Sequence, residues 1–192
     1  MVTPATALFV VGAAAATVIV ASLLVTLATD GRLWPPGDDR RKATLHWGLV
    51  GVFDVCILGL AALQWDTWLL PRPASLVVGG LLSVTGAAIF LRASRAMDAA
   101  ETTGRAATEL YTEGLYARTR NPQYLGMIVG LAGFALLVDA RSVAVLAALH
   151  VCWLVLLPFA EEPWLREQFG EQYDRYCERV PRFVGVRTLT GG

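Results

Sequence analysis

Residues 114–126, with the sequence GLYARTRNPQYLG, bring together side chains that could bind an anion. Pro122 is typical of the first turn of a helix, Arg120 lies just before that turn and Tyr124 lies within it. The first N–H groups of a helix have no partner inside it, and the helix dipole is positive there. The segment therefore predicts an anion-binding helix start. The alternative is that Arg118 and Arg120 only anchor the chain at a membrane surface.

A second polar cluster follows at residues 161–183, EEPWLREQFGEQYDRYCERVPRF. Its apolar side chains recur at helical spacing and predict an amphipathic helix that lies on a membrane or packs against nearby loops. Glu161 and Glu162 are costly to desolvate together unless a cation faces them. The alternative is that these acids favour a helix start just before Pro163, and that Glu171 and Arg175 form an ordinary surface pair.

Asp54 lies in the middle of an apolar stretch, and an acid inside a membrane is a functional candidate by default. We favour a structural role, with His46 or a Trp N–H as its partner. His46 and His150 lack metal-ligand spacing and are interpreted as packing residues. The three cysteines form no CxxC pair, so no metal site is predicted.

The elements that must position these residues are membrane helices. The chain has 192 residues, of which 55% are hydrophobic and 17% charged, with a mean hydropathy of +0.52. Five apolar stretches approach the ~20 residues that cross a bilayer. They cover approximately residues 6–28, 45–63, 75–91, 124–139 and 142–160. We therefore predict an all-α membrane protein with five transmembrane helices and a C-terminal amphipathic helix. Residues 1–95 would form the first three spans, and residues 96–192 a second half that holds the polar clusters.

The distribution of basic residues predicts the orientation. Fourteen of the sixteen Lys and Arg residues follow the first, third or fifth span, and only Arg72 and Arg141 lie on the other side. Because the cytoplasmic side carries the excess of basic residues, the N-terminus is expected outside and the C-terminus inside. Sixteen acidic residues balance the basic ones, so nucleic acid is not an expected partner. Composition rich in Ala and Arg suggests a prokaryotic cytoplasmic membrane, and the sequence does not indicate an oligomeric state.

The spacing within both clusters resembles that of the membrane methyltransferases that include isoprenylcysteine carboxyl methyltransferases and phospholipid methyltransferases. The first cluster matches at Gly114, Tyr116, Arg120, Asn121, Pro122, Tyr124 and Gly126. The second matches at Glu161, Glu162, Leu165, Phe169, Gly170, Tyr173, Tyr176, Val180, Pro181 and Arg182. The resemblance covers residues 92–185. Asn121 stands where prenylcysteine enzymes have His, Leu115 replaces a Pro, and Gly185 replaces the final Pro, so a prenylcysteine substrate is less favoured.

This resemblance implies S-adenosylmethionine as methyl donor, bound on the cytoplasmic side beneath the C-terminal helix, with membrane lipids around the protein. A lipophilic or lipid acceptor would enter from the bilayer. The implied catalytic residues are Arg120, Glu162 and Arg182. The implied cofactor-binding residues are Tyr116, Asn121, Pro122, Tyr124, Leu125, Glu161, Tyr173 and Tyr176.

The sequence leaves the chemical class of the methyl acceptor open. An ionised carboxylate needs only an arginine to position it, whereas an amine, thiol or phenol needs a base. The clusters offer arginines and no histidine, which favours an acceptor that is ionised beforehand, although Glu161, Glu162 or a tyrosine could act as a base. Two other functions remain: an NADPH-dependent reductase of the sterol-reductase type, and a non-enzymatic membrane component.

Overall fold

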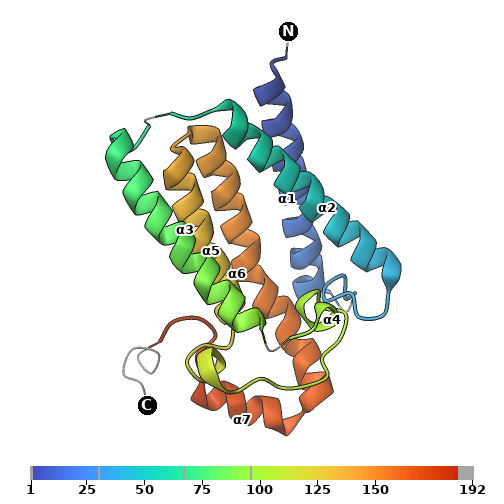
Figure 1. Cartoon of the computed structure of the whole chain (residues 1–192). Coiled ribbons are helices and arrows are strands. Elements are labelled where there is room, and N and C mark those ends of the chain that lie inside the picture. The colour runs from blue at the N-terminus through green and yellow to red at the C-terminus, as the bar shows by residue number, and fades with distance from the viewer. Residues whose placement is uncertain (1, 30, 67, 96, 186–192) are drawn as a thin grey trace.

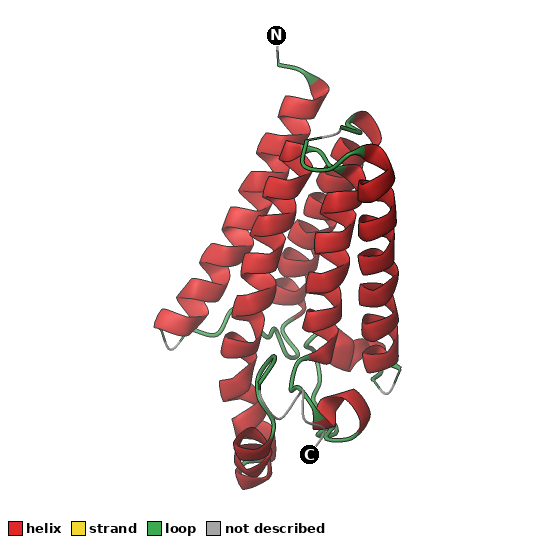
Figure 2. Ribbon diagram, turned by 90° about the vertical axis from the view of Figure 1, so that its left-hand side faces the viewer, coloured by secondary structure: helices red, strands yellow, loops and turns green. Residues whose placement is uncertain are grey.

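In the computed structural model, which describes residues 2–29, 31–66, 68–95 and 97–185, every regular element is a helix. The long helices run side by side, and the short ones gather at one end of the bundle, here called the site end (Figures 1 and 2). The elements are α1 (Pro4–Ala28), α2 (Arg40–Leu63), α3 (Arg72–Ser94), α4 (Ala99–Thr102), η1 (Gly114–Ala117), α5 (Pro122–Val138), α6 (Arg141–Phe169) and α7 (Glu171–Arg179).

Four of these helices, α1, α2, α3 and α6, are long and apolar enough to cross a membrane. The fourth predicted span, residues 124–139, corresponds to α5, which is apolar but has only 17 residues. At 1.5 Å per residue α5 is roughly 25 Å long, slightly less than the hydrocarbon core of a bilayer. The all-α prediction is confirmed for the described residues, and four helices meet the requirements for a span.

The bundle is held together by two kinds of packing. Helices α3 and α5 lie against each other along their glycines, where a Cβ on Gly126 would lie 2.6 Å from the backbone N of Phe90. Helices α1, α2 and α6 instead share a core of larger apolar side chains, among them the fully buried Ile19, Phe53 and Leu146. The close approach of α3 and α5 is typical of membrane helices, where small residues at an interface allow two backbones to come near each other.

Helix α6 differs from the predicted span and positions the second cluster. It continues through Pro158 and Pro163 to Phe169, instead of ending near residue 160. Glu161 and Glu162 therefore lie inside a helix, and the interpretation that they mark a helix start was wrong. Buried side chains continue along α6 past Pro158, and this packing outweighs the local preference of proline.

The chain then turns at Gly170, whose φ of +52° favours glycine, and α7 begins. The apolar face of α7 does not lie open: Tyr173, Tyr176 and Val180 pack with Leu110 and Leu165. Of the two predicted placements for the amphipathic segment, the structure has the one that packs against a loop. The predicted surface pair is also present, with Arg175 Nη1 3.1 Å from Glu171 Oε2.

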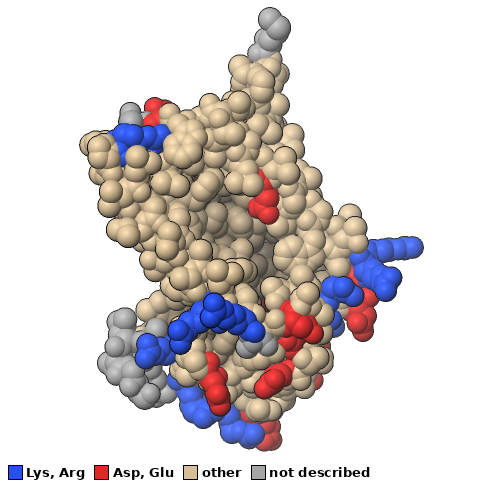
Figure 3. Space-filling model, in the orientation of Figure 1, with Lys and Arg blue, Asp and Glu red and all other residues tan. Residues whose placement is uncertain are grey.

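Asp54 has no partner of the expected kind. Its neighbour Phe53 packs on His150 of α6, and Cys56 faces α1. Asp54 itself is exposed, and no described residue is seen to form a hydrogen bond or ion pair with it. The expected pair with His46 is not formed, because the His46 ring stacks on Trp34 with centroids 4.0 Å apart. In the view of Figure 3, a group of acidic atoms lies beside a hollow in a part of the surface that otherwise carries no charged side chains.

We expect Asp54→Leu to raise the free energy of unfolding by about 2–3 kcal/mol in detergent or lipid, since an acid at the centre of a membrane helix costs about that much. Thermal unfolding followed by circular dichroism would measure the change, with Asp54→Asn as the variant that removes charge but keeps polarity. A loss of stability in both variants would instead mean that the carboxylate has a partner when the protein is in a membrane.

Candidate functional site

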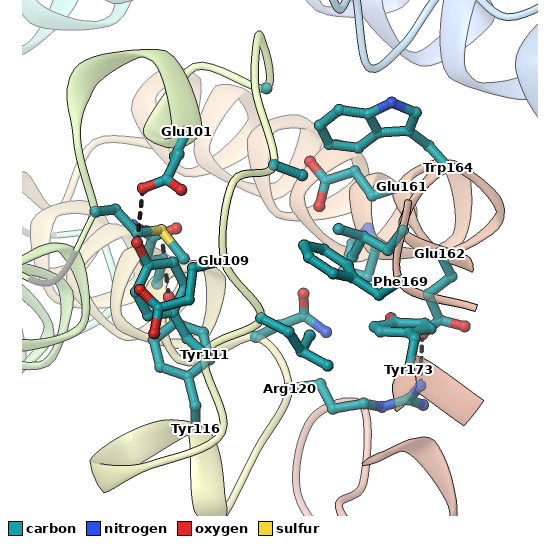
Figure 4. Close-up of a pocket in the computed structure, with 18 of the residues that line it drawn as sticks. Glu101, Glu109, Tyr111, Tyr116, Arg120, Glu161, Glu162, Trp164, Phe169 and Tyr173 are labelled. Carbon is teal, nitrogen blue, oxygen red and sulfur yellow. Dashed lines mark hydrogen bonds and ion pairs between the residues drawn. The ribbon is translucent and has the colours of Figure 1, made fainter. Parts of the chain in front are cut away.

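A cavity lies at the site end, between the segment that runs from Met97 to η1 and the ends of α5, α6 and α7. It contains about 860 Å³ of empty space, part of it open to solvent. Acidic and aromatic side chains line it (Figure 4). The lining residues include Glu101, Glu109, Tyr111, Tyr116, Arg120, Asn121, Tyr124, Glu161, Glu162, Trp164, Phe169, Tyr173 and Tyr176.

Glu162 is the centre of a buried ion cluster on one side of this cavity. Its side chain is 5% exposed, and Arg182 holds both carboxylate oxygens, with Nε 2.6 Å from Oε1 and Nη2 2.7 Å from Oε2. Arg120, which is 10% exposed, adds a third contact through Nη1 at 3.2 Å. The hydrogen bond to Glu162 is the main cause that raises the pKa of Arg182 above its ordinary value. This arrangement fits a bidentate pair that is stabilised by a second cation.

The C-terminal segment closes the site by hydrogen bonds to the start of α5. Arg120 N donates to Pro181 O at 2.9 Å, and Asn121 Nδ2 donates to Arg182 O at 2.9 Å. The Tyr176 hydroxyl donates to Tyr116 O at 2.7 Å. The two sequence clusters are therefore brought together by main-chain contacts as well as by the Glu162 ion cluster.

Glu161 has a different environment from its neighbour Glu162. Its Oε1 accepts a hydrogen bond from Trp34 Nε1 at 2.9 Å and another from the Tyr124 hydroxyl. Both donors are neutral, and no basic side chain among the described residues forms an ion pair with Glu161. Adjacent carboxylates on one helix thus have separate environments: arginines neutralise Glu162, whereas Glu161 accepts hydrogen bonds from two neutral donors and lines the cavity.

The tyrosines of the cavity stay neutral at physiological pH. Burial raises the pKa of Tyr116, Tyr173 and Tyr176 well above the ordinary value of a phenol. Burial, followed by the hydrogen bond to Glu101, raises the pKa of Tyr111 to about 12. These phenols therefore do not supply a base.

Most residues predicted for the site lie around this cavity. Tyr116, Arg120, Asn121, Tyr124, Glu161, Glu162, Tyr173 and Tyr176 line it. Arg182 does not line it but holds Glu162 from behind, with its guanidinium 3.8 Å from the centre of the Phe159 ring. Pro122 is buried at the first turn of α5, and neither it nor Leu125 lines the cavity. These two residues belong to the first turn of the helix that carries Tyr124. Their place in the motif is therefore explained by the structure of that helix and not by contact with a ligand.

Several residues of the site were not predicted. Trp34 lies far from both clusters in the sequence, but it is 3% exposed and donates a hydrogen bond to Glu161. Glu101 caps its own short helix with Asp98 and accepts a hydrogen bond from Tyr111 at 2.7 Å. Cys177 receives an N–H from Arg120. The capping pattern from Asp98 to Glu101 was readable in the sequence, but nothing local pointed to Trp34.

The chemistry of the cavity suits a cationic ligand with a flat ring. Glu101 and Glu109 lie on the wall opposite Glu161, and aromatic side chains lie on both walls (Figure 4). Arg120 Nε is buried without a hydrogen-bond partner among the described residues, so it can donate to an anionic group of the same ligand. The described residues include no group of three His, Cys, Asp or Glu side chains that could hold a metal ion.

Comparison with known proteins identifies the class of this protein. Residues 74–172, more than half of the chain, match the sequence model of the phospholipid methyltransferase family. The chain therefore belongs to this family of membrane methyltransferases, as the motif spacing predicted. The match includes the first cluster and residues 161–172 of the second, but not the rest of the second cluster or the segment that carries Trp34. No solved structure matches the chain significantly.

Three curated relatives show how far the similarity extends. The nickel-cobalt-cadmium resistance protein NccN of Alcaligenes xylosoxydans xylosoxydans is 31% identical over 121 residues, which cover 62% of this chain and 54% of that protein. Protein-S-isoprenylcysteine O-methyltransferase B of Arabidopsis thaliana is 33% identical over 79 residues, 40% of this chain and 39% of that protein. The cobalt-zinc-cadmium resistance protein CzcN of Cupriavidus metallidurans is 29% identical over 150 residues, 76% and 65% of the two chains. The matched regions thus span about two fifths to two thirds of these relatives.

Proposed function

We propose that this protein transfers a methyl group from S-adenosylmethionine to a lipophilic acceptor that reaches the site end from the bilayer. The observation that carries the proposal is the acidic and aromatic cavity beside the Glu162 ion cluster, in a member of the phospholipid methyltransferase family. The names of the metal-resistance relatives describe those proteins, and the described residues offer no metal cluster that would favour such a role here.

The residues of the cavity fit the groups of this methyl donor. Glu101 and Glu109 would hold its ammonium group, and the free Nε of Arg120 would hold its carboxylate. The aromatic side chains would flank its adenine ring, and Glu161 would face its cationic sulfur. When bound, the donor supplies a methyl group on a positively charged sulfur, which is ready for in-line displacement.

The chain itself would position the methyl donor and the acceptor and exclude water from the cavity. The Glu162 ion cluster fixes Arg120, and the bonds from Asn121 and Tyr176 hold the C-terminal segment over the cavity. Residues 96–192 would thus form the cofactor-binding half, with residues 1–95 as its membrane anchor. The five-span topology, with the site end in the cytoplasm of a prokaryotic cell, is part of this proposal and is supported by the basic residues near that end.

Titration of S-adenosylmethionine into detergent-purified protein by calorimetry tests the proposal, with NADPH in a parallel cell. We expect saturable binding of the methyl donor and none of NADPH. Glu101→Gln should weaken donor binding about tenfold, as loss of one charge-assisted hydrogen bond costs about 1.5 kcal/mol or more. Glu171→Gln, which changes an exposed acid on α7, is the control and should bind as the wild type does. Absence of donor binding by the wild type would reject the methyltransferase function.

A further inference from the structure

The two oxygens of Glu161 are not equivalent. Oε1 accepts both the Trp34 and the Tyr124 hydrogen bonds, whereas no described residue donates to Oε2. Because Glu161 lines the cavity, Oε2 is left for a ligand. Glu162 has no such free oxygen, since Arg182 holds both of its oxygens at 2.6 and 2.7 Å.

No other group near Glu161 is as well placed to receive a proton. The titratable groups around it are Tyr124, which donates to it, Tyr116 across the cavity, and Glu162 with its arginines. Glu162 is neutralised, and burial keeps Tyr116 protonated by raising its pKa. Glu101 lies on the opposite wall of the cavity, where the proposed function has it hold the ammonium group of the donor.

We propose that Glu161 Oε2 takes the proton of the methyl acceptor, and that Trp34 is the positioning residue that aims this oxygen into the cavity. The inference rests on the proposed function and narrows its substrate class: the acceptor is a nucleophile that arrives with its proton, an amine, thiol or hydroxyl group on a lipophilic molecule. It reverses the preference for a pre-ionised acceptor, because the arginines on which that preference depended are engaged with Glu162.

The proposed step transfers a methyl group to the acceptor and a proton to Glu161. The lone pair of the acceptor atom forms a bond to the methyl carbon, and the bond from that carbon to sulfur breaks with its electron pair staying on the sulfur. The proton of the acceptor passes to Glu161 Oε2. The positive charge on sulfur and the negative charge on the carboxylate are both lost, so charge is conserved. Removal of opposite charges in a site with little water favours this step.

Trp34 reaches Glu161 from a loop outside the family match, and several contacts fix it there. Its ring stacks on His46, and a Cβ on Gly104 would lie 3.1 Å from it. Gly37 N donates to Gly104 O at 3.3 Å, which ties the same loop to the segment that lines the cavity. A tryptophan that is buried on all sides and donates its only N–H to Glu161 is suited to orient that carboxylate.

The first experiment needs neither donor nor acceptor. The ¹⁵N-labelled indole signal of Trp34, assigned by its loss in Trp34→Phe, is followed by NMR as pH is varied. We expect the wild-type signal to move in a single titration as Glu161 binds a proton, and this movement to be absent in Glu161→Gln. A Trp34 signal that titrates equally in wild type and Glu161→Gln would overturn the proposal even if the protein proves to be a methyltransferase.

The second experiment measures donor consumption with three probe acceptors in detergent: dodecanethiol, dodecylamine and dodecanoate. We expect transfer to the thiol and the amine to exceed transfer to the carboxylate. With the donor at saturating concentration, Glu161→Gln should lower thiol and amine transfer at least 100-fold, and Trp34→Phe should lower it about tenfold. Preference for dodecanoate, or full thiol and amine transfer by Glu161→Gln, would refute the inference while leaving the proposed function intact. If the wild type uses no probe, the NMR titration decides.

Discussion

Glu162→Ala is expected to lower the free energy of unfolding by about 3–5 kcal/mol, the largest effect we foresee for a single side chain in this protein. The substitution removes the only carboxylate seen to pair with Arg120 in the described part of the chain, and Arg120 is 10% exposed. Its guanidinium would then be a buried charge without a counter-ion. Arg182, which is 29% exposed, can turn to solvent and should contribute less to the loss.

Thermal unfolding in detergent, followed by circular dichroism, measures this effect. Glu171→Ala is the matched control, because it removes the carboxylate of an exposed pair on the next helix and should change stability by less than about 0.5 kcal/mol. The double variant Glu162→Ala with Arg120→Met should recover part of the loss, since it removes the unpaired charge as well. A Glu162→Ala protein as stable as the control would mean that the ion cluster does not hold the site together.

The residues of the site could be predicted from sequence wherever the signal was local. Spacing within 114–126 and 161–183 identified most of the cavity side chains, and the need for a cation opposite the paired glutamates is met at Glu162 by Arg120 and Arg182. Neither argument could find Trp34, because 127 residues separate it from Glu161 and its type suited a membrane interface equally well. The different roles of Glu161 and Glu162 likewise depend on three-dimensional partners.

The fold shows the same division between local and long-range information. Hydropathy found the long helices, but the prolines in α6 suggested a break that tertiary packing prevents. The glycines of α3 and α5 are packing residues, since these helices meet backbone to backbone. The sequence did not say which glycines face the partner helix, because glycine is common all along membrane helices.

Gly86→Ala should therefore separate α3 from α5 and lower the free energy of unfolding by about 3 kcal/mol, the upper part of the range for overpacked interiors. A Cβ on Gly86 would lie 2.5 Å from Gly126 O, and backbone atoms cannot move aside as a flexible side chain can. The effect should extend to the site, because Gln123 Nε2 at the start of α5 donates to Ser94 Oγ at the end of α3 at 3.0 Å. We expect weaker donor binding together with the lower stability.

Gly80→Ala is the control for this prediction, since it lies on the same helix and a Cβ there would meet no atom within 4 Å. Alanine favours a helix over glycine, so this variant should be as stable as the wild type or up to about 1 kcal/mol more stable. Thermal unfolding and donor titration are measured for both variants. If Gly86→Ala lowers stability and Gly80→Ala does not, the backbone contact between α3 and α5 is the cause of the loss. Equal losses would instead attribute the effect to helix α3 alone and not to its contact with α5.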